Sequence, residues 1–323
     1  MISVFREKSS FSVFWLLLLS VVLHSHFFIV PPQVVVTGTS VWMKALLMPL
    51  NAMPSIFLVL LYHAIIVVQA LRLSAVLNNL RMFPKLYFIP ALCYLLLTAL
   101  LPAWSHITPA LLFNFIILWL FALLARLYSS PRSRPLIYNA GFLTGLCVVI
   151  YPPCLFLVPA AFFALALLRA FRFNEWIILL LGILTPLYLL ASILFLNDSL
   201  ASLLPVLPQF SPHLLTGNEI PLVIATIAGG ALIVAGVFFW QGNIGRMIIQ
   251  TRRCWSVLFL MFLLSIPLLF VMKGEDASVL MLGMIPAAAL SSNTFVYSKN
   301  ELLQNIIFWV FVIVIMFNNW YWL

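Results

Sequence analysis

Long runs of apolar residues, separated by short polar segments, follow one another along most of the chain. A transmembrane helix needs about 20 such residues to cross roughly 30 Å of hydrocarbon. The runs are continuous and do not alternate between apolar and polar positions, which excludes a transmembrane β-barrel. The pattern therefore predicts an all-α integral membrane protein with about eleven transmembrane helices, within a range of about ten to twelve. They are expected at residues 11–30, 53–74, 86–104, 109–127, 137–151, 153–168, 176–197, 221–240, 255–272, 279–297 and 303–322.

One apolar run, residues 137–168, is too long for one span and slightly short for two. Basic residues flank it, at Arg134 and Arg169. Basic flanks favour the cytoplasm, so the chain must cross the membrane an even number of times between them. Residues 151–153, Tyr-Pro-Pro, favour a turn, because proline lacks an N–H donor and disfavours helical geometry in the residue before it. We therefore expect a helical hairpin at 137–168, with its turn on the outer side.

The composition agrees with a membrane protein. Hydrophobic residues make up 65% of the 323-residue chain and charged residues only 7%, whereas soluble domains carry about 25% charged residues. No stretch is left for a soluble domain, so residues 1–323 are expected to form a single polytopic membrane domain. The first apolar run begins like a signal peptide, after Arg6 and Lys8, but it is too long for a typical apolar h-region and no Ala-x-Ala-like cleavage site follows, so it is expected to be a retained span.

The charges predict an orientation. The chain has 16 Lys and Arg residues, and all of them except Lys44 and Lys273 fall on one side of the predicted topology. The positive-inside rule then places the N-terminus in the cytoplasm and the C-terminus outside. The net charge of +9 does not indicate a nucleic-acid partner, because the basic residues are spread singly or in pairs between apolar runs.

Two outer loops are longer than a turn. The first, about residues 31–52, contains TSVWMKALLMPL and is expected to form a short interfacial helix. The second, about residues 198–220, is apolar and interrupted by three prolines, so we expect it to lie on the membrane or to pack into an outward cavity. These loops and the turn at 151–153 face the same side and can form one outer vestibule.

The stretch RPLIYNAGFLTGLCVVIYPPCLFLVPAAFFALALLRAFRFNEWIILLLGILTPLYLLASILFLND resembles the core of the glycosyltransferase C superfamily, polytopic enzymes that use lipid-linked sugars. The similar features are Gly141 and Gly145 in a short span, an aromatic–proline turn, a returning span and a basic loop. The start FREKSS and this layout also look like an uncharacterised family of bacterial multi-span proteins. The resemblance implies a glycosyltransferase-C-like core in a bacterial inner membrane. It also implies an acidic residue in the first outer loop, yet residues 31–52 contain none.

Four outer acids are the first candidates for chemistry. Asp198 and Glu219 bracket the second outer loop, and Glu275 and Asp276 lie in KGED on the same side. Two of these carboxylates brought together would bind a divalent cation for a pyrophosphate group. The alternative is that they are solvated loop ends.

His63 is the other candidate, because an ionisable group in the middle of a span suggests a functional site. The alternative is a neutral imidazole that bonds a neighbouring helix or Asn114. His24 and His26, near the outer end of the first span, would point in nearly opposite directions on a helix and are not expected to share a metal ion. The four cysteines have no metal-binding spacing. We predict no metal site; the sequence requires no cofactor and leaves its identity open, and a divalent cation is expected only if the protein is an enzyme.

Three functions remain open. The first is a non-catalytic or degenerate glycosyltransferase-C-like subunit of a cell-envelope complex, with the lipid bilayer and other membrane proteins as partners. The second is an active membrane transferase that uses a lipid-linked glycan donor at the outer face. The third is a transporter, which ranks last because transporters usually show internal repeats and intramembrane charges. The missing acid favours the first function.

Overall fold

The structure is a computed structural model that describes residues 2–6, 10–36, 41–130, 133–199, 219–268 and 277–321. Helices make up most of this part of the chain. The α-helices are α1 (Ser10–Leu23), α2 (Val41–Leu47), α3 (Ser55–Asn79), α4 (Ile89–Thr98), α5 (Pro109–Arg126), α6 (Ser133–Ile150), α7 (Leu157–Leu168), α8 (Phe173–Leu196), α9 (Glu219–Asn243), α10 (Ile249–Ser265), α12 (Met284–Tyr297) and α13 (Glu301–Trp320). The 3-10 helices are η1 (Ile2–Arg6), η2 (Ser25–Phe28), η3 (Met48–Ala52), η4 (Pro102–Ser105), η5 (Pro152–Phe156), η7 (Ile244–Arg246) and η8 (Ala277–Gly283).

Seven helices in the described part of the chain are long and apolar enough to cross a membrane. They are α3, α5, α6, α8, α9, α12 with η8, and α13. Three shorter apolar helices, α1, α4 and α7 with η5, accompany them. The protein is therefore an all-α, multi-pass membrane protein, while eleven crossings and their orientation stay predictions.

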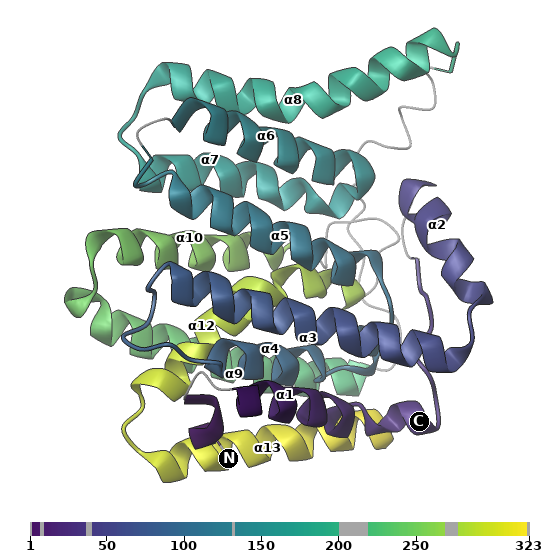
Figure 1. Ribbon diagram of the computed structural model, residues 1–323, viewed down its shortest axis with the longest axis vertical. Helices are drawn as coiled ribbons and strands as arrows, with labels where there is room; N and C mark the ends of the chain where they lie inside the picture. Colours follow the sequence, from purple (N-terminus) through teal and green to yellow (C-terminus); the bar gives the residue numbers. More distant parts are fainter. Residues whose placement is uncertain are drawn as a thin grey trace.

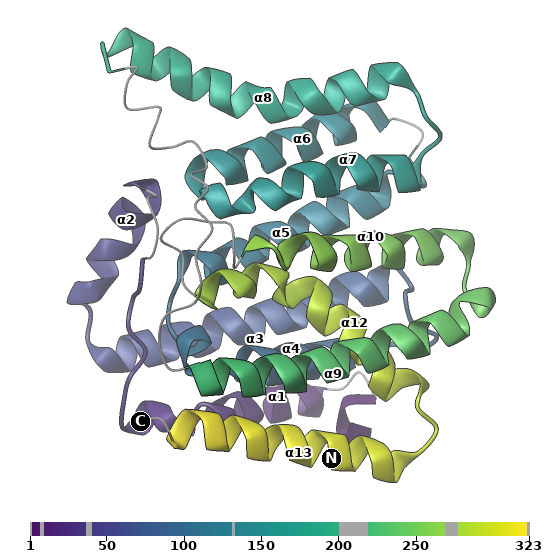
Figure 2. The same ribbon diagram turned by 180° about the vertical axis from the view of Figure 1, so that it is seen from behind.

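The helices lie side by side, with their connections gathered at two ends (Figures 1 and 2). The connections α3–α4, α5–α6, α7–α8, α9–α10 and α12–α13 lie at the left end in Figure 1. We call it the basic end, because its connections carry Arg81, Lys85, Arg169, Arg172, Arg246 and Lys299. Helix α2 and the C-terminus lie at the other end, which we call the opposite end.

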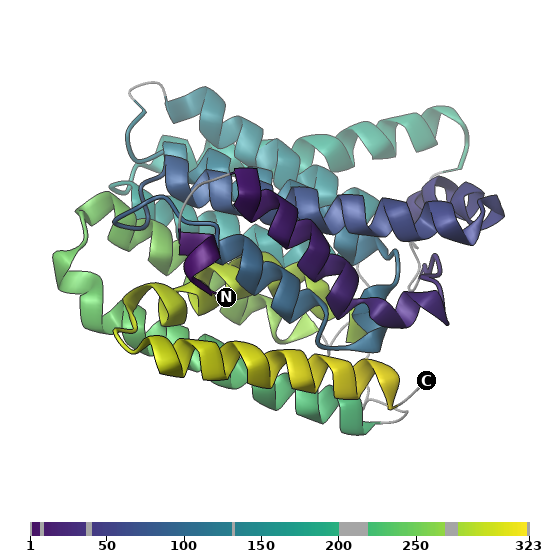
Figure 3. The ribbon, with the colours of Figure 1, turned by 60° about the horizontal axis from the view of Figure 1, so that its bottom comes forward.

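The core runs through the middle of this array. Helices α8 and α13 form its two edges, and α13 lies beside α9 (Figures 1 and 3). Every residue of α4 is buried, and so is every residue of α12 from Met284 to Phe295. Only five residues of α8 are buried, in contrast, and many of its large apolar side chains are exposed, as expected of a helix that faces lipid.

Helix α4 is shorter than the span expected at residues 86–104. It ends at Thr98, and Leu101 is extended, because the residue before Pro102 is disfavoured in helical geometry. Ten helical residues rise only about 15 Å, half the thickness of the hydrocarbon core.

The carbonyl groups beyond the end of α4 are paired by another helix. The side-chain amide of Asn319 donates to the carbonyl oxygen of Ala99 at 2.9 Å, and that of Asn318 donates to the carbonyl oxygen of Leu100 at 2.9 Å. Backbone groups inside a membrane must find partners within the protein. Helix α13 therefore allows α4 to end inside the bundle.

The chain between Ser133 and Leu168 forms two helices. Helix α6 ends at Ile150, Tyr151 is extended, and η5 leads into α7. The end of α6 and the start of α7 lie at the opposite end of the bundle (Figure 1).

Helices α6 and α8 approach each other through glycines. A methyl group placed on Gly141 would lie 2.5 Å from the carbonyl oxygen of Leu179, and one placed on Gly182 would lie 2.6 Å from that of Tyr138. A methyl group on Gly145 would overlap the backbone of Ile183. Small residues allow this close packing of backbones, which drives helix association where lipid replaces water.

A buried ion pair joins the helices at the basic end. Arg169 Nε lies 2.9 Å from Oε2 of Glu175, which is only 4% exposed. The Ser133 hydroxyl donates to Oε1 of Glu175 at 3.1 Å, and Arg169 Nη1 donates to the carbonyl oxygen of Leu127 at 3.0 Å. The pair thus connects α8 with the ends of α5 and α6.

We expect Gly145→Ala to destabilise the protein by about 1–3 kcal/mol, because the added methyl group forces the backbones of α6 and α8 apart. Gly242→Ala is the matched control, since nothing lies within 4 Å of a methyl group at that helical position. Thermal unfolding in detergent measures both. Equal melting temperatures for the two variants would contradict the packing role of Gly145.

We expect Glu175→Ala to cost about 3 kcal/mol, because it leaves the partly buried Arg169 without its counter-ion. Glu301→Ala removes an acid of the same type, but the 3.4 Å pair of Glu301 with Arg6 is solvent-exposed and is worth less than about 1 kcal/mol. Denaturation of both variants in mixed micelles measures the difference. A similar loss in the two variants would show that the ion pair at Glu175 has no special structural role.

Candidate functional site

Buried polar side chains gather where the end of α1 meets α3. The hydroxyl oxygen of Ser20 lies 2.9 Å from Nδ1 of His63. Nδ1 of His24 lies 2.9 Å from the carbonyl oxygen of Ser20, and His24 Nε2 lies 3.2 Å from the Tyr62 hydroxyl. A carbonyl oxygen only accepts, so His24 carries its proton on Nδ1 and its Nε2 is an acceptor. We call Ser20, His24, His26, Tyr62 and His63 the histidine cluster.

The hydroxyl of Tyr62 connects this cluster to η4. It lies within hydrogen-bonding distance of two acceptors, His24 Nε2 and the carbonyl oxygen of Trp104, the latter at 3.1 Å. One phenolic proton serves both acceptors. The ring of Phe27 packs against those of His24, Tyr62 and His63 with centroid distances of 5.3, 5.1 and 5.7 Å, which closes the cluster with apolar surface.

The positions of His24 and His26 differ from the sequence expectation. Their ring centroids are 6.0 Å apart, and those of His24 and His63 are 5.6 Å apart. Helix α1 ends at Leu23 and η2 begins at Ser25, so the two histidines do not follow the helical geometry that would separate them. Within the described part of the chain, no three or more His, Cys, Asp or Glu side chains are placed to hold a metal ion.

A second buried network ties α3, α4 and α5 together. The Tyr94 hydroxyl donates to Oε1 of Gln69 at 2.6 Å, and Nε2 of Gln69 donates to the carbonyl oxygen of Leu111 at 2.7 Å. Nδ2 of Asn114 donates to the Tyr94 hydroxyl at 3.3 Å. Asn114 therefore pairs with Tyr94, and His63 pairs with Ser20. The sequence alone did not indicate Tyr94, because a tyrosine inside an apolar run has no distinguishing pattern.

An apolar groove of about 460 Å³ lies between α4, η4, α9, α10, η8 and α12. Its walls are mainly aliphatic, with Thr226, Ser265 and Trp104 as the polar contributors. Gly229 and Gly230 have no side chains to fill the groove where α9 lines it. A methyl group placed on Gly230 would meet no atom within 4 Å.

The groove lies toward the opposite end of the bundle. It is lined by α9 between residues 225 and 234, by the last turn of α10 and by η8. Trp104 connects it to the histidine cluster: its indole lines the groove and donates to the carbonyl oxygen of Ala277 at 2.9 Å, and its own carbonyl accepts from Tyr62.

The first outer loop is held against the connection between α4 and α5. The carbonyl of Gln33 accepts from Ile107 N–H at 2.9 Å, and Nδ1 of His106 accepts from Gln33 N–H at 3.3 Å. Burial lowers the pKa of His106, which favours the neutral imidazole that can accept this bond. The loop then forms α2 and η3, whereas the second loop lies outside the described residues from 200 to 218.

The predicted acids occupy different situations. Asp198 follows α8, is exposed and has a φ of 52°, a conformation that Asp tolerates better than most residues. Glu219 begins α9, and nothing is described of its side chain. Glu275 and Asp276 lie outside the described residues, so a cation site formed by these acids stays a prediction.

No protein-family model matches the chain, and neither do the curated proteins or the solved structures with which it was compared. Its function must therefore be inferred from its own residues.

We expect the hydrogen bond between Ser20 and His63 to stabilise the protein by about 0.6 kcal/mol, the average for interhelical bonds in a membrane protein. His63→Gln and Ser20→Ala, measured singly and together by thermal unfolding, form a double-mutant cycle. The two losses should not add, because either change removes the same bond. Strictly additive losses would show that the two side chains act independently.

Proposed function

We propose that this protein is a non-catalytic membrane subunit of the cell envelope, with a glycosyltransferase-C-like core, that holds the hydrocarbon chain of a lipid in the apolar groove. The groove is the observation that carries the proposal. Its volume, about 460 Å³, lies in the range of roughly 300–1,000 Å³ that is usual for ligand pockets. Its apolar walls suit an acyl or isoprenoid chain better than a sugar.

The charge distribution supports an orientation for the bound lipid. The basic end faces the cytoplasm by the positive-inside rule, so the groove lies in the outer half of a bacterial inner membrane. The hydrocarbon chain then enters from the outer leaflet, and its polar part lies near η4, η8 and the outer loops. A lipid-linked glycan has this shape, which agrees with the superfamily that residues 134–198 resemble.

The chemistry of the groove wall supports holding rather than transfer. Transfer from a lipid-linked donor needs a base to activate the acceptor and a positive group to neutralise the leaving phosphate. The described wall offers the hydroxyls of Thr226 and Ser265 and the indole of Trp104. Both hydroxyls donate to carbonyls within their own helices, at 2.7 Å each. These groups orient a lipid, and catalysis falls to a partner subunit.

The exposed apolar faces of α8 and α13 support a place in a complex. Both helices lie at the edges of the bundle and carry large exposed side chains, among them Tyr188 and Phe195 on α8 and Trp309 on α13. In a bilayer these faces meet lipid or the helices of other membrane proteins.

The test fills the groove with a side chain added at a glycine of its wall. We expect Gly230→Leu to abolish retention of lipid by the purified protein, because its side chain occupies open space in the groove. Gly242→Leu is the matched control on the same helix, where open space also surrounds the added Cβ and the groove does not extend. Native mass spectrometry of the proteins in mild detergent counts the retained lipids, and a photoreactive polyprenyl phosphate locates its chain.

Each outcome decides between functions. Loss of lipid in Gly230→Leu but not in Gly242→Leu supports the proposal. Equal retention in both variants, or crosslinks away from the groove, overturns it. Glycan transfer by the purified protein, abolished by Asp198→Asn at normal protein abundance, would establish the transferase alternative.

A further inference from the structure

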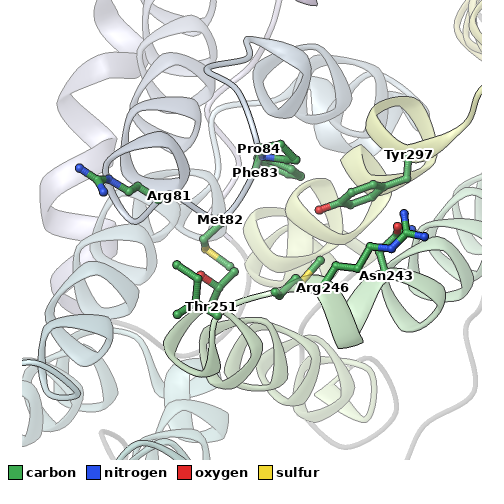
Figure 4. A pocket seen from close by; sticks show the side chains of 10 residues that line it. Arg81, Met82, Phe83, Pro84, Asn243, Arg246, Thr251 and Tyr297 are labelled. Carbon is green, nitrogen blue, oxygen red and sulfur yellow. The ribbon is translucent and has the colours of Figure 1, made fainter.

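A second pocket lies at the basic end, on the far side of the bundle from the apolar groove. Its volume is about 440 Å³. Three parts of the chain meet there: residues 81–84 after α3, residues 243–248 between α9 and α10, and Tyr297 at the end of α12. Thr251 in the first turn of α10 completes the lining (Figure 4).

The pocket carries positive charge that no acid among the described residues neutralises. Arg81 and Arg246 line it, and neither forms an ion pair or a hydrogen bond with the described residues. Figure 4 shows them on opposite sides of the pocket, with the guanidinium of Arg81 directed away from the other labelled side chains. Both arginines are exposed, and Arg246 is the one that lies nearer to Thr251 and the start of α10 along the chain.

Thr251 is a buried polar group without a partner. Its side chain is 5% exposed, lines the pocket and makes no hydrogen bond to any described residue. Hydroxyl groups of residues this deeply buried usually have a hydrogen-bond partner. A ligand in the pocket would supply the missing acceptor.

The start of α10 points to an anionic ligand. Residues 247 and 248 line the pocket, and the N-cap residue Ile248 provides no side-chain cap for the helix. The first backbone N–H groups of a helix have no acceptor within it, and they carry its positive partial charge. This is the arrangement with which helices bind phosphate groups. Helix α10 has 17 residues, which is long enough for its N-terminus to carry the partial charge of a regular helix.

The remaining lining makes the pocket amphipathic. The hydroxyl of Tyr297 points toward the interior of the pocket in Figure 4 and makes no hydrogen bond within the described chain. Met82, Phe83 and Pro84 form an apolar wall. Asn243 contributes little, because its side-chain amide already donates to the carbonyl of Phe239 at 2.8 Å.

We propose that this pocket binds a phosphate group, held by Arg246, the Thr251 hydroxyl and the first turn of α10. The apolar wall beside the donors fits the glycerol and first methylenes of an anionic phospholipid, and a basic pocket between helices at a membrane surface is a usual place for such a headgroup. The same donors would hold inorganic phosphate, so the two sources must be separated by experiment.

The test compares lipids of equal chain length. Protein carrying Gly230→Leu, which removes any lipid held in the apolar groove, is exposed to phosphatidylglycerol, to phosphatidylcholine or to inorganic phosphate. Native mass spectrometry counts the retained molecules, and calorimetry measures phosphate binding. We expect phosphatidylglycerol to be retained in preference to phosphatidylcholine. Arg246→Gln should weaken retention about tenfold or more, because it removes a charged hydrogen-bond donor.

Two further variants separate binding from structure. Thr251→Val should weaken retention while leaving the melting temperature unchanged or higher, because it replaces an unpaired hydroxyl by an apolar group of the same shape. Arg172→Gln removes the same charge at the basic end from an exposed residue outside the pocket, and it should leave retention unchanged.

The outcomes distinguish the two sources and decide the proposal. Binding of inorganic phosphate that depends on Arg246, without a preference between the lipids, would keep the phosphate site and make the free ion its ligand. Equal effects of Arg246→Gln and Arg172→Gln, or retention that Thr251→Val does not change, would overturn the site. The apolar groove is unaffected by either result, since it lies at the other end of the bundle.

Discussion

The need to pair every backbone polar group inside hydrocarbon governs the architecture of this protein. It explains why an array of long helices encloses the irregular parts of the chain. The clearest case is the chain after α4, where the carbonyl groups of Ala99 and Leu100 accept from Asn319 and Asn318 of α13. These two bonds join residues more than two hundred positions apart. Without them, the buried end of α4 would leave acceptors unpaired in an apolar core.

The polar side chains inside the bundle serve the same purpose between helices. The histidine cluster joins α1, α3 and η4, and the network around Tyr94 joins α3, α4 and α5. Most of their donors and acceptors face one another, which limits the cost of burying them, whereas Nδ1 of His26 and Oδ1 of Asn114 have no partner among the described residues. At the basic end, where water is closer, the corresponding connection is an ion pair between Arg169 and Glu175.

The two cavities differ in chemistry and lie at different ends of the bundle. The groove toward the opposite end is apolar and suits a hydrocarbon chain, whereas the pocket at the basic end offers an arginine, a free hydroxyl and a helix N-terminus to an anion. The lipid proposed for the groove and the phosphate group proposed for the pocket would suit the role of a membrane subunit. The occupancy of its two cavities would then depend on the lipid composition of both leaflets.

The sequence by itself determined the solvent, the class of fold and most helix positions. Continuous apolar runs that are long enough for a helix to span a membrane are compatible with few other folds. The pair Pro152–Pro153 marked the break between α6 and α7. The same local signals gave no account of the cavities or of most polar pairs. His63 was evident as a buried ionisable residue, but its partner, Ser20, lies 43 positions away. Arg246 and Thr251 looked like ordinary residues at the membrane boundary.

Only the tertiary structure decided these points, because they depend on which helices are neighbours. Hydrophobic periodicity reports that a helix is surrounded by apolar groups, whether these are lipid or protein, so it does not distinguish the buried α4 from the exposed α8. The local sequence also did not predict that α1 ends at Leu23. Because the helix ends there, the rings of His24 and His26 lie in one cluster. Composition sets the medium in which the chain folds, and packing sets which polar groups meet within it.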